Sequence, residues 1–232
     1  MNAARASSAS YGLDRRHRSS GAEPRVPART RRAGRGPGHG RASGAAVVLA
    51  VVAVVAALAV VFGPQLSRSV RRLELPLGDE QIIREQAAAK HLDPALIAAV
   101  IYAETKFDPR TSVAGAQGLM QILPSTALFL AHLSGGVSFT TNDLGTPAIN
   151  VAYGSYYLRY LLDHYGGDEM LAVAAYNAGL ANVDGWVAKA DAEGKRLQIG
   201  EIPFGQTRAY VQRVLAAQKE YRALYARQLG LS

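Results

Sequence analysis

An uncharged apolar run near the N-terminus constrains this chain more than any other feature. It reads AAVVLAVVAVVAALAVVF from Ala45 to Phe62, with Gly44 before it and Gly63 after it. As a helix, these 18 residues rise about 27 Å, close to the thickness of the hydrocarbon core of a bilayer. We therefore predict a transmembrane helix over residues 44–63.

The charges around this run predict its orientation. Residues 1–43 hold ten arginines against Asp14 and Glu23, so they carry the whole net charge of +8. By the positive-inside rule, the N-terminus lies in the cytoplasm and the rest of the chain lies in the periplasmic or extracytoplasmic space. A cleaved signal peptide is the rival interpretation, but the run is long for one, and small-x-small patterns occur only inside it. We expect an uncleaved, single-pass signal anchor in the cell membrane.

The basic tail and the remainder of the chain have different compositions. Residues 1–43 are rich in Arg, Ser, Gly, Ala and Pro, and lack the apolar clusters that folding needs. We expect a disordered cytoplasmic tail, with solvation as the first interpretation and contact with anionic headgroups as the second. Because the chain after residue 43 is neutral overall, the folded domain is not expected to bind nucleic acid. Without cysteine, the chain can have neither a disulfide nor a lipoprotein anchor.

After a short linker at residues 64–76, the pattern is helical. We predict helices over residues 78–91, 94–104, 124–133, 150–166, 168–179 and 205–229. The polar stretch 134–147 is expected to form a loop at the surface. No segment alternates convincingly with a period of two, so the domain at residues 77–230 is predicted to be all-α.

Glu104 stands on the apolar face of one predicted helix. Asp93, followed by a proline, is a suitable N-cap for this helix. From there Ile97, Val100, Ile101 and Glu104 fall on one stripe. A carboxylate in such a stripe is costly to ionise, so its pKa should be raised, which suits a general acid. The other interpretation is a solvated glutamate just beyond the end of the stripe.

Three motifs give the chain a resemblance to a known family. They are ETKFDP at Glu104–Pro109, GAQGLMQ at Gly115–Gln121 and AYNAG at Ala175–Gly179. In these three motifs, the chain resembles the soluble lytic transglycosylase (SLT) domain, which has a lysozyme-like fold of the goose type. That family shows Glu-Ser-x-Phe-x-Pro, Gly-Ala-x-Gly-Leu-Met-Gln and Ala-Tyr-Asn-Ala-Gly in the same order. Two positions depart from its pattern: Thr105 replaces the usual serine but keeps the hydroxyl, and Gln206 stands where a glutamate is usual.

The resemblance implies an activity on peptidoglycan. A member of this family cleaves the β-1,4 bond between MurNAc and GlcNAc in glycan strands and leaves a 1,6-anhydro-MurNAc end. By this resemblance, Glu104 first protonates the glycosidic oxygen and then, as a carboxylate, accepts the proton of the attacking 6-hydroxyl. The N-acetyl group stabilises the developing cation, so that neither a second carboxylate nor a cofactor is needed.

Further residues match positions that contact sugar or orient the glutamate in the family. They are Ser112, Gln121, Tyr176, Asn177 and Tyr210. Each has a structural alternative: the tyrosines as core aromatics, the serine and Gln121 as groups that close loops, and the asparagine as a helix cap.

Other candidate residues are given structural roles. Asp108 directly precedes a proline and is interpreted as a turn residue rather than as a second catalytic carboxylate. Met120 and Trp186 are interpreted as packing residues, although a tryptophan could also stack on a sugar. His132 and His164 show no ligand spacing with other His, Cys or carboxylate residues, so we predict no metal site.

Two other functions remain open. A hydrolase of the lysozyme type would use the same fold but admit water. A non-catalytic protein that binds or organises the cell wall would keep the cleft without the reaction. The intact Glu104 and its flanking motifs favour the transglycosylase.

Overall fold

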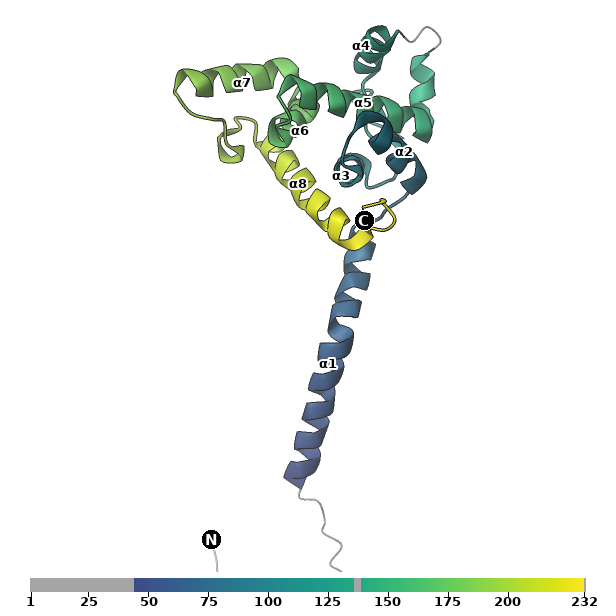
Figure 1. Cartoon of the computed structure of the whole chain (residues 1–232), viewed down its shortest axis with the longest axis vertical. Coiled ribbons are helices and arrows are strands. Elements are labelled where there is room, and N and C mark those ends of the chain that lie inside the picture. Colours follow the sequence, from purple (N-terminus) through teal and green to yellow (C-terminus); the bar gives the residue numbers. More distant parts are fainter. Residues whose placement is uncertain (1–43, 136–138, 232) are drawn as a thin grey trace, which may run out of the picture. The chain divides into compact units, whose positions relative to one another are not determined.

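The computed structural model describes residues 44–135 and 139–231 (Figure 1). The predicted tail at residues 1–43 lies outside this part, as do residues 136–138 of the predicted loop. The chain divides into two compact units, residues 1–50 and 51–232, and the contacts given below lie within the second. The elements, with 3-10 helices marked η, are α1 (Gly44–Glu74), α2 (Glu80–Lys90), α3 (Pro94–Thr105), β1 (Arg110–Thr111), β2 (Gln117–Gly118), α4 (Pro124–Ser134), η1 (Thr141–Gly145), α5 (Pro147–His164), α6 (Glu169–Ala178), α7 (Leu180–Ala192), η2 (Ile199–Glu201) and α8 (Gly205–Tyr225).

Helix α1 contains the apolar run and extends well past it. It ends at Glu74, so residues 64–74 of the expected linker continue the helix, with Pro64 inside it. The large apolar side chains of the run are exposed. Within the described residues, α1 is the one helix that is long and apolar enough to cross a membrane.

Helix α3 lies in the middle of the core. Its first seven residues after the proline, Ala95 to Ile101, are each at most 1% exposed. The helix is therefore buried on all sides, which corrects our expectation of a single apolar stripe. Helix α8 makes the most extensive contact with it, and α2 packs against it as well (Figure 1). Glu104 stands in the last turn of this helix, where it leaves the core.

Local sequence signals set the helix boundaries. The Asp93 carboxylate caps α3 by accepting the Ala95 N–H at 3.0 Å, as predicted. Gly179 ends α6 with a φ of 85°, also as predicted. We did not predict α7, which begins at the very next residue. Its apolar residues Leu180, Val183, Trp186 and Val187 do follow a helical spacing, but the interior Gly185 and the stop signal at Gly179 weigh against a helix here.

Between α3 and α4, a short hairpin carries the motif Gly115–Gln121, which we call the glycine segment. Gly118 in β2 has a φ of +73°, and a Cβ there would lie 2.2 Å from the Asn150 amide, so only glycine fits. Asn150 of α5 is fully buried. Its amide accepts the Met120 N–H at 2.8 Å and donates to the carbonyls of Gln117, at 2.8 Å, and Leu144, at 3.0 Å. One side chain thus satisfies two backbone groups of this segment and one of η1.

We predict that Asn150→Ala lowers the free energy of unfolding by about 3 kcal/mol, because it leaves buried backbone groups without partners. Urea denaturation of the full chain in detergent would measure the change. Asn182 of α7 is exposed, and its amide donates to the Ala178 carbonyl only four residues earlier, at the end of α6, so Asn182→Ala should change the free energy by about 0.5 kcal/mol or less. Equal effects of the two substitutions would contradict this account of the segment.

Candidate active site

The site is built around a hydrogen bond between two distant residues. The Tyr210 hydroxyl donates to Glu104 Oε1 at 2.7 Å. Tyr210, on the second turn of α8, is 2% exposed, whereas Glu104 is only partly buried. A buried hydroxyl on α8 thus holds the carboxyl group of a residue that keeps part of its surface exposed. The structure brings these two predicted site residues together through the packing of α8 on α3.

The surroundings of Glu104 act on its proton affinity in both directions. Burial raises its pKa above the ordinary value, while the bond from Tyr210 and the nearby charges of Arg213 and Arg110 partly offset this rise. Arg110 also donates to the Glu104 carbonyl at 3.1 Å. Among the described residues, the two charged groups that shift this pKa are both arginines, and no carboxylate contributes to the shift. The predicted rise in the pKa is confirmed.

Tyr176 forms a second side of the site. Its hydroxyl donates to the Met120 carbonyl at 2.9 Å, and burial and the nearby Glu104 raise its pKa well above the ordinary value. The hydroxyl of Tyr210 behaves in the same way, for the same two causes. Both tyrosines therefore remain neutral hydrogen-bond donors. Met120 is fully buried, in agreement with its predicted packing role.

Thr105 shows why a hydroxyl is needed beside the glutamate. It is 1% exposed, and its hydroxyl lies 2.8 Å from the Leu119 carbonyl and 3.2 Å from the Ile101 carbonyl. The first contact fixes the glycine segment to the end of α3. Threonine and serine can both make it, so the departure of this residue from the family pattern leaves the contact intact.

Gln121 and Ser112 close the loop beside the site. Gln121 has a φ of 48°, and its amide donates to the carbonyls of Arg110, at 2.7 Å, and Gly118, at 2.9 Å. The Ser112 hydroxyl accepts the Ala116 N–H at 3.0 Å. Both residues thus make the loop-closing hydrogen bonds that we gave as their structural alternative. Their contact with sugar stays a prediction.

Asn177 joins two of the helices that carry the site. Its Oδ1 accepts the Thr207 hydroxyl at 2.9 Å, which ties α6 to α8. It is therefore not the helix cap that we gave as its alternative. The neighbouring Gln206 is exposed in the first turn of α8. Asp108 is also exposed, in the turn after α3, as expected.

The contacts of Trp186 and of His164 involve residues other than Glu104. The Trp186 ring packs edge-on against Phe204 at 5.0 Å and is only partly buried. His164 pairs with Asp184 at 2.9 Å, and His132 is exposed on α4. Throughout the described residues, no group of three or more His, Cys, Asp or Glu side chains is arranged to hold a metal ion.

The structure contains a hollow beside Tyr176 that we did not predict from the sequence. It has a volume of about 290 Å³ and is lined by Ser125, Thr126, Phe129, Tyr157, Tyr160 and Leu180. The Tyr157 ring lies 5.3 Å from the Tyr176 ring and so connects the hollow to the site. Tyr157 and Tyr160 lie three residues apart on α5. This spacing, which puts both rings on one face of a helix, is the signal in the sequence that could have found the hollow.

Comparison with known proteins identifies the family. The model of the transglycosylase SLT domain matches residues 81–199, just over half of the chain. The chain belongs to the transglycosylase SLT domain family.

Several named proteins share this similarity. The soluble lytic murein transglycosylase of Escherichia coli (strain K12) is 31% identical over 150 residues, which cover 63% of this chain and 23% of that protein. The membrane-bound lytic murein transglycosylase C of Histophilus somni (strain 2336) is 30% identical over 171 residues, covering 62% of this chain and 46% of that protein. An inactive mutant of the lytic transglycosylase Slt from Pseudomonas aeruginosa aligns with a TM-score of 0.59 at 30% identity, over 66% of this chain and 25% of that one. The chain thus spans about a quarter of the length of the Escherichia coli and Pseudomonas aeruginosa relatives.

We predict that Glu104→Gln stabilises the fold as the pH rises. Because the folded pKa of Glu104 exceeds the ordinary value of 4.5, the unfolded chain releases this proton first and the stability due to this group falls with rising pH. Glutamine has no such proton. The difference in unfolding temperature between variant and parent should therefore grow from about pH 4 toward neutral pH. Calorimetry would measure it, with Glu85→Gln on an exposed face of α2 as the baseline; a difference independent of pH would contradict the buried-acid account.

Proposed function

We propose that this chain is a membrane-anchored peptidoglycan lytic transglycosylase in which Glu104 acts first as an acid and then as a base. The observation that carries the proposal is a partly buried carboxyl group with a raised pKa, held by the Tyr210 hydroxyl and lacking a carboxylate partner among the described residues. Such a group retains its proton near neutral pH better than an exposed glutamate does.

In the first step, Glu104 donates its proton to the glycosidic oxygen between MurNAc and GlcNAc. The bond from C1 to this oxygen breaks, and the oxygen leaves as a hydroxyl of the departing strand. Positive charge develops at C1, and the N-acetyl carbonyl of the substrate stabilises it. The Glu104 carboxylate that remains accepts the Tyr210 hydroxyl and lies near Arg110 and Arg213, which favour its ionised form.

In the second step, the 6-hydroxyl of the same sugar attacks C1. Glu104 accepts the proton of this hydroxyl and returns to its starting form, and the new bond closes the 1,6-anhydro ring. Because the nucleophile belongs to the same sugar, its proximity replaces the work of a second protein group. The usual pair of carboxylates of glycoside hydrolases is then unnecessary.

Two properties of the relatives support the proposal. Three of them are named as lytic transglycosylases, two of these as acting on murein. The Pseudomonas aeruginosa protein is inactive as a mutant in which glutamine replaces a glutamate, which agrees with a reaction that depends on one glutamate.

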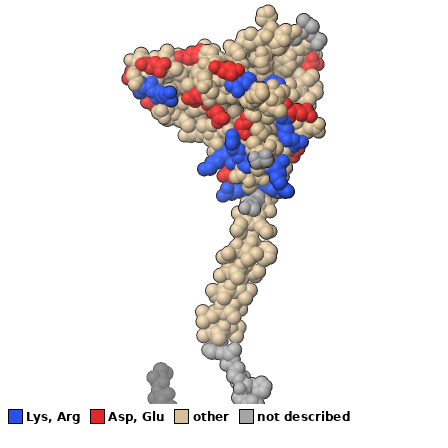
Figure 2. Space-filling model, viewed as in Figure 1, with Lys and Arg blue, Asp and Glu red and all other residues tan. Residues whose placement is uncertain are grey.

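The proposed anchor is α1. No charged residue occurs from Gly44 to Ser67, and the helix surface over this run shows neither blue nor red in Figure 2. Arg71 and Arg72 follow the run in the last turn of the same helix, where they would meet lipid headgroups. One relative is named as membrane-bound. We infer a single pass, with residues 1–43 in the cytoplasm and residues 77–230 in the extracytoplasmic space.

Digestion of purified murein sacculi by the full chain in detergent micelles tests the reaction. The parent should release muropeptides with 1,6-anhydro-MurNAc ends, and Glu104→Gln should lower the rate by about 10³-fold. Glu85→Gln, at an exposed position, serves as the matched control. Mass spectrometry separates the alternatives: products heavier by one water would indicate a hydrolase, and no cleavage by the parent would indicate a non-catalytic protein.

Cysteine labelling tests the topology, since the parent contains no cysteine. We expect Ala188→Cys to react with a membrane-impermeant maleimide in intact spheroplasts, and Ser20→Cys to react only after the membrane is opened. The cysteine-free parent gives the background. The opposite labelling pattern would reverse the orientation, and recovery of a shortened chain in the soluble fraction would indicate a cleaved signal peptide.

A further inference from the structure

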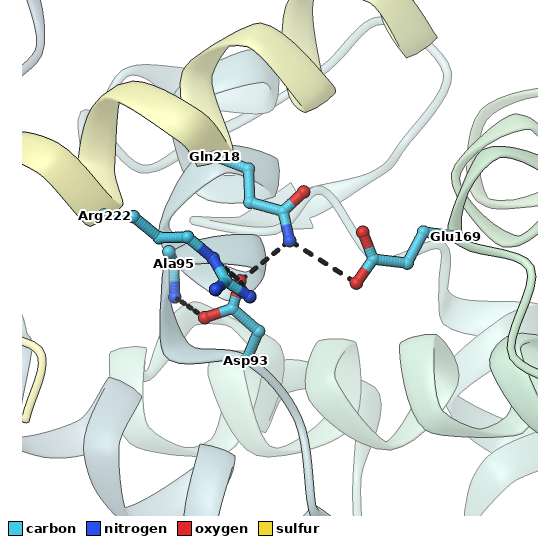
Figure 3. A network of polar contacts seen from close by, with 5 residues as sticks. All are labelled: Asp93, Ala95, Glu169, Gln218 and Arg222. Atoms are coloured by element: carbon cyan, nitrogen blue, oxygen red, sulfur yellow. Dashed lines mark hydrogen bonds and ion pairs between the residues drawn. The ribbon is translucent and has the colours of Figure 1, made fainter. Parts of the chain in front are cut away.

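A cluster of polar side chains joins three helices away from Glu104. Asp93, 10% exposed, uses one carboxylate oxygen to cap α3. Its other oxygen accepts the Gln218 amide at 2.7 Å and the Arg222 guanidinium at 2.9 Å. Gln218 is 7% exposed, and Figure 3 shows its amide pointing between the carboxylates of Asp93 and Glu169. The contact with Glu169 is longer, at 3.4 Å.

These contacts connect the opposite end of α3 to the same partner helix. Asp93 starts α3 and bonds α8 at Gln218, whereas Glu104 ends α3 and bonds α8 at Tyr210. The two helices are therefore antiparallel. Along α3 the two bonding residues are about 16 Å apart, and along α8 Tyr210 and Gln218 are about 12 Å apart. The pair of helices is thus tied by hydrogen bonds near both ends.

Between these ties, the contact is apolar. The buried face of α8 there consists of Val211, Val214 and Ala217, and the middle of α3 is equally apolar. Apolar contact is non-directional, and packed helices can slide past one another by small amounts. The directional groups at the ends therefore determine where α8 stands along α3. Glu169 extends the same tie to α6, the helix that carries Tyr176.

We propose that Gln218 is a positioning residue, which together with Asp93 and Arg222 fixes the register of α8 along α3 and thereby holds the Tyr210 hydroxyl against Glu104. Gln218 does not touch the reacting atoms. Its importance for catalysis rests on the proposed function, but its effect on Glu104 does not.

The consequence for Glu104 has a definite sign. The groups that act on its proton affinity are Tyr210 and Arg213 from α8 and Arg110 from β1. The charge of Glu104 in turn raises the pKa of Tyr176 on α6. Burial is the largest influence and raises the pKa of Glu104, whereas the bond from Tyr210 and the charge of Arg213, both carried by α8, lower it. Displacement of α8 weakens this bond, so the pKa should rise when the register tie is removed.

The test is a titration of Glu104 in the full chain in detergent micelles, with isotopically labelled glutamate carboxyl carbons observed by NMR and Glu104→Gln used for assignment. Gln218→Leu removes the tie. Asp93→Asn is a second variant, because asparagine has one acceptor oxygen and can serve either the cap or the tie, but not both. Both variants should raise the titration midpoint of Glu104 and lower kcat on sacculi by about 10- to 100-fold.

A matched control and a double mutant separate positioning from a general loss of stability. Gln81 is an exposed glutamine that bonds only Glu85 in its own helix, so Gln81→Leu should leave the midpoint unchanged. Tyr210→Phe alone should raise the midpoint, and adding Gln218→Leu to it should raise it no further, because the tie acts through Tyr210.

Each outcome decides the proposal. An unchanged midpoint in folded Gln218→Leu would overturn it, and so would an undiminished further rise in the double mutant. If the parent fails to cleave sacculi, the proposed function fails, whereas the titration still tests the register tie.

Discussion

The structure depends on burying a helix that has no polar face. Each residue of α3 from Ala95 to Ile101 is at most 1% exposed, so its neighbours must surround it. Burial of this apolar surface supplies stability but little direction. The polar groups of α3 are confined to its two ends, with Asp93 at the start and Glu104 and Thr105 in the last turn. The side chains of α3 can therefore form hydrogen bonds only at its two ends. These bonds determine the positions of the neighbouring helices.

The three sequence motifs meet at one segment of backbone, because that segment needs partners in the interior. Thr105, in the first motif, lies within hydrogen-bond distance of the Leu119 carbonyl in the second. Tyr176, in the third, donates to the Met120 carbonyl. Asn150, outside all three motifs, accepts the N–H of Met120. Much of what resembles a catalytic signature is thus the hydrogen bonding of a buried glycine segment beside the catalytic candidate.

The sequence predicted the helical class of the domain, the start of α3 and the raised pKa of Glu104, because these follow from local patterns and burial. We did not predict α7, which begins directly after the stop signal at Gly179 and contains Gly185, or the hollow lined by Tyr157, whose aromatic residues also suit a core. The contact between Asp93 and Gln218 joins residues that are 125 positions apart. The periodicity of the sequence does not reveal such a pairing, because the pairing depends on how two formed helices pack.

A single group that serves as acid and then as base needs opposing influences on its proton affinity. Burial alone would raise the pKa of Glu104 and make it a reluctant donor once substrate excludes water. The Tyr210 bond and the charges of Arg213 and Arg110 lower the pKa, and in the proposed mechanism they would stabilise the carboxylate that the first proton transfer leaves. The proton affinity of Glu104 is therefore a balance between burial, which raises its pKa, and one hydroxyl and two cations, which lower it.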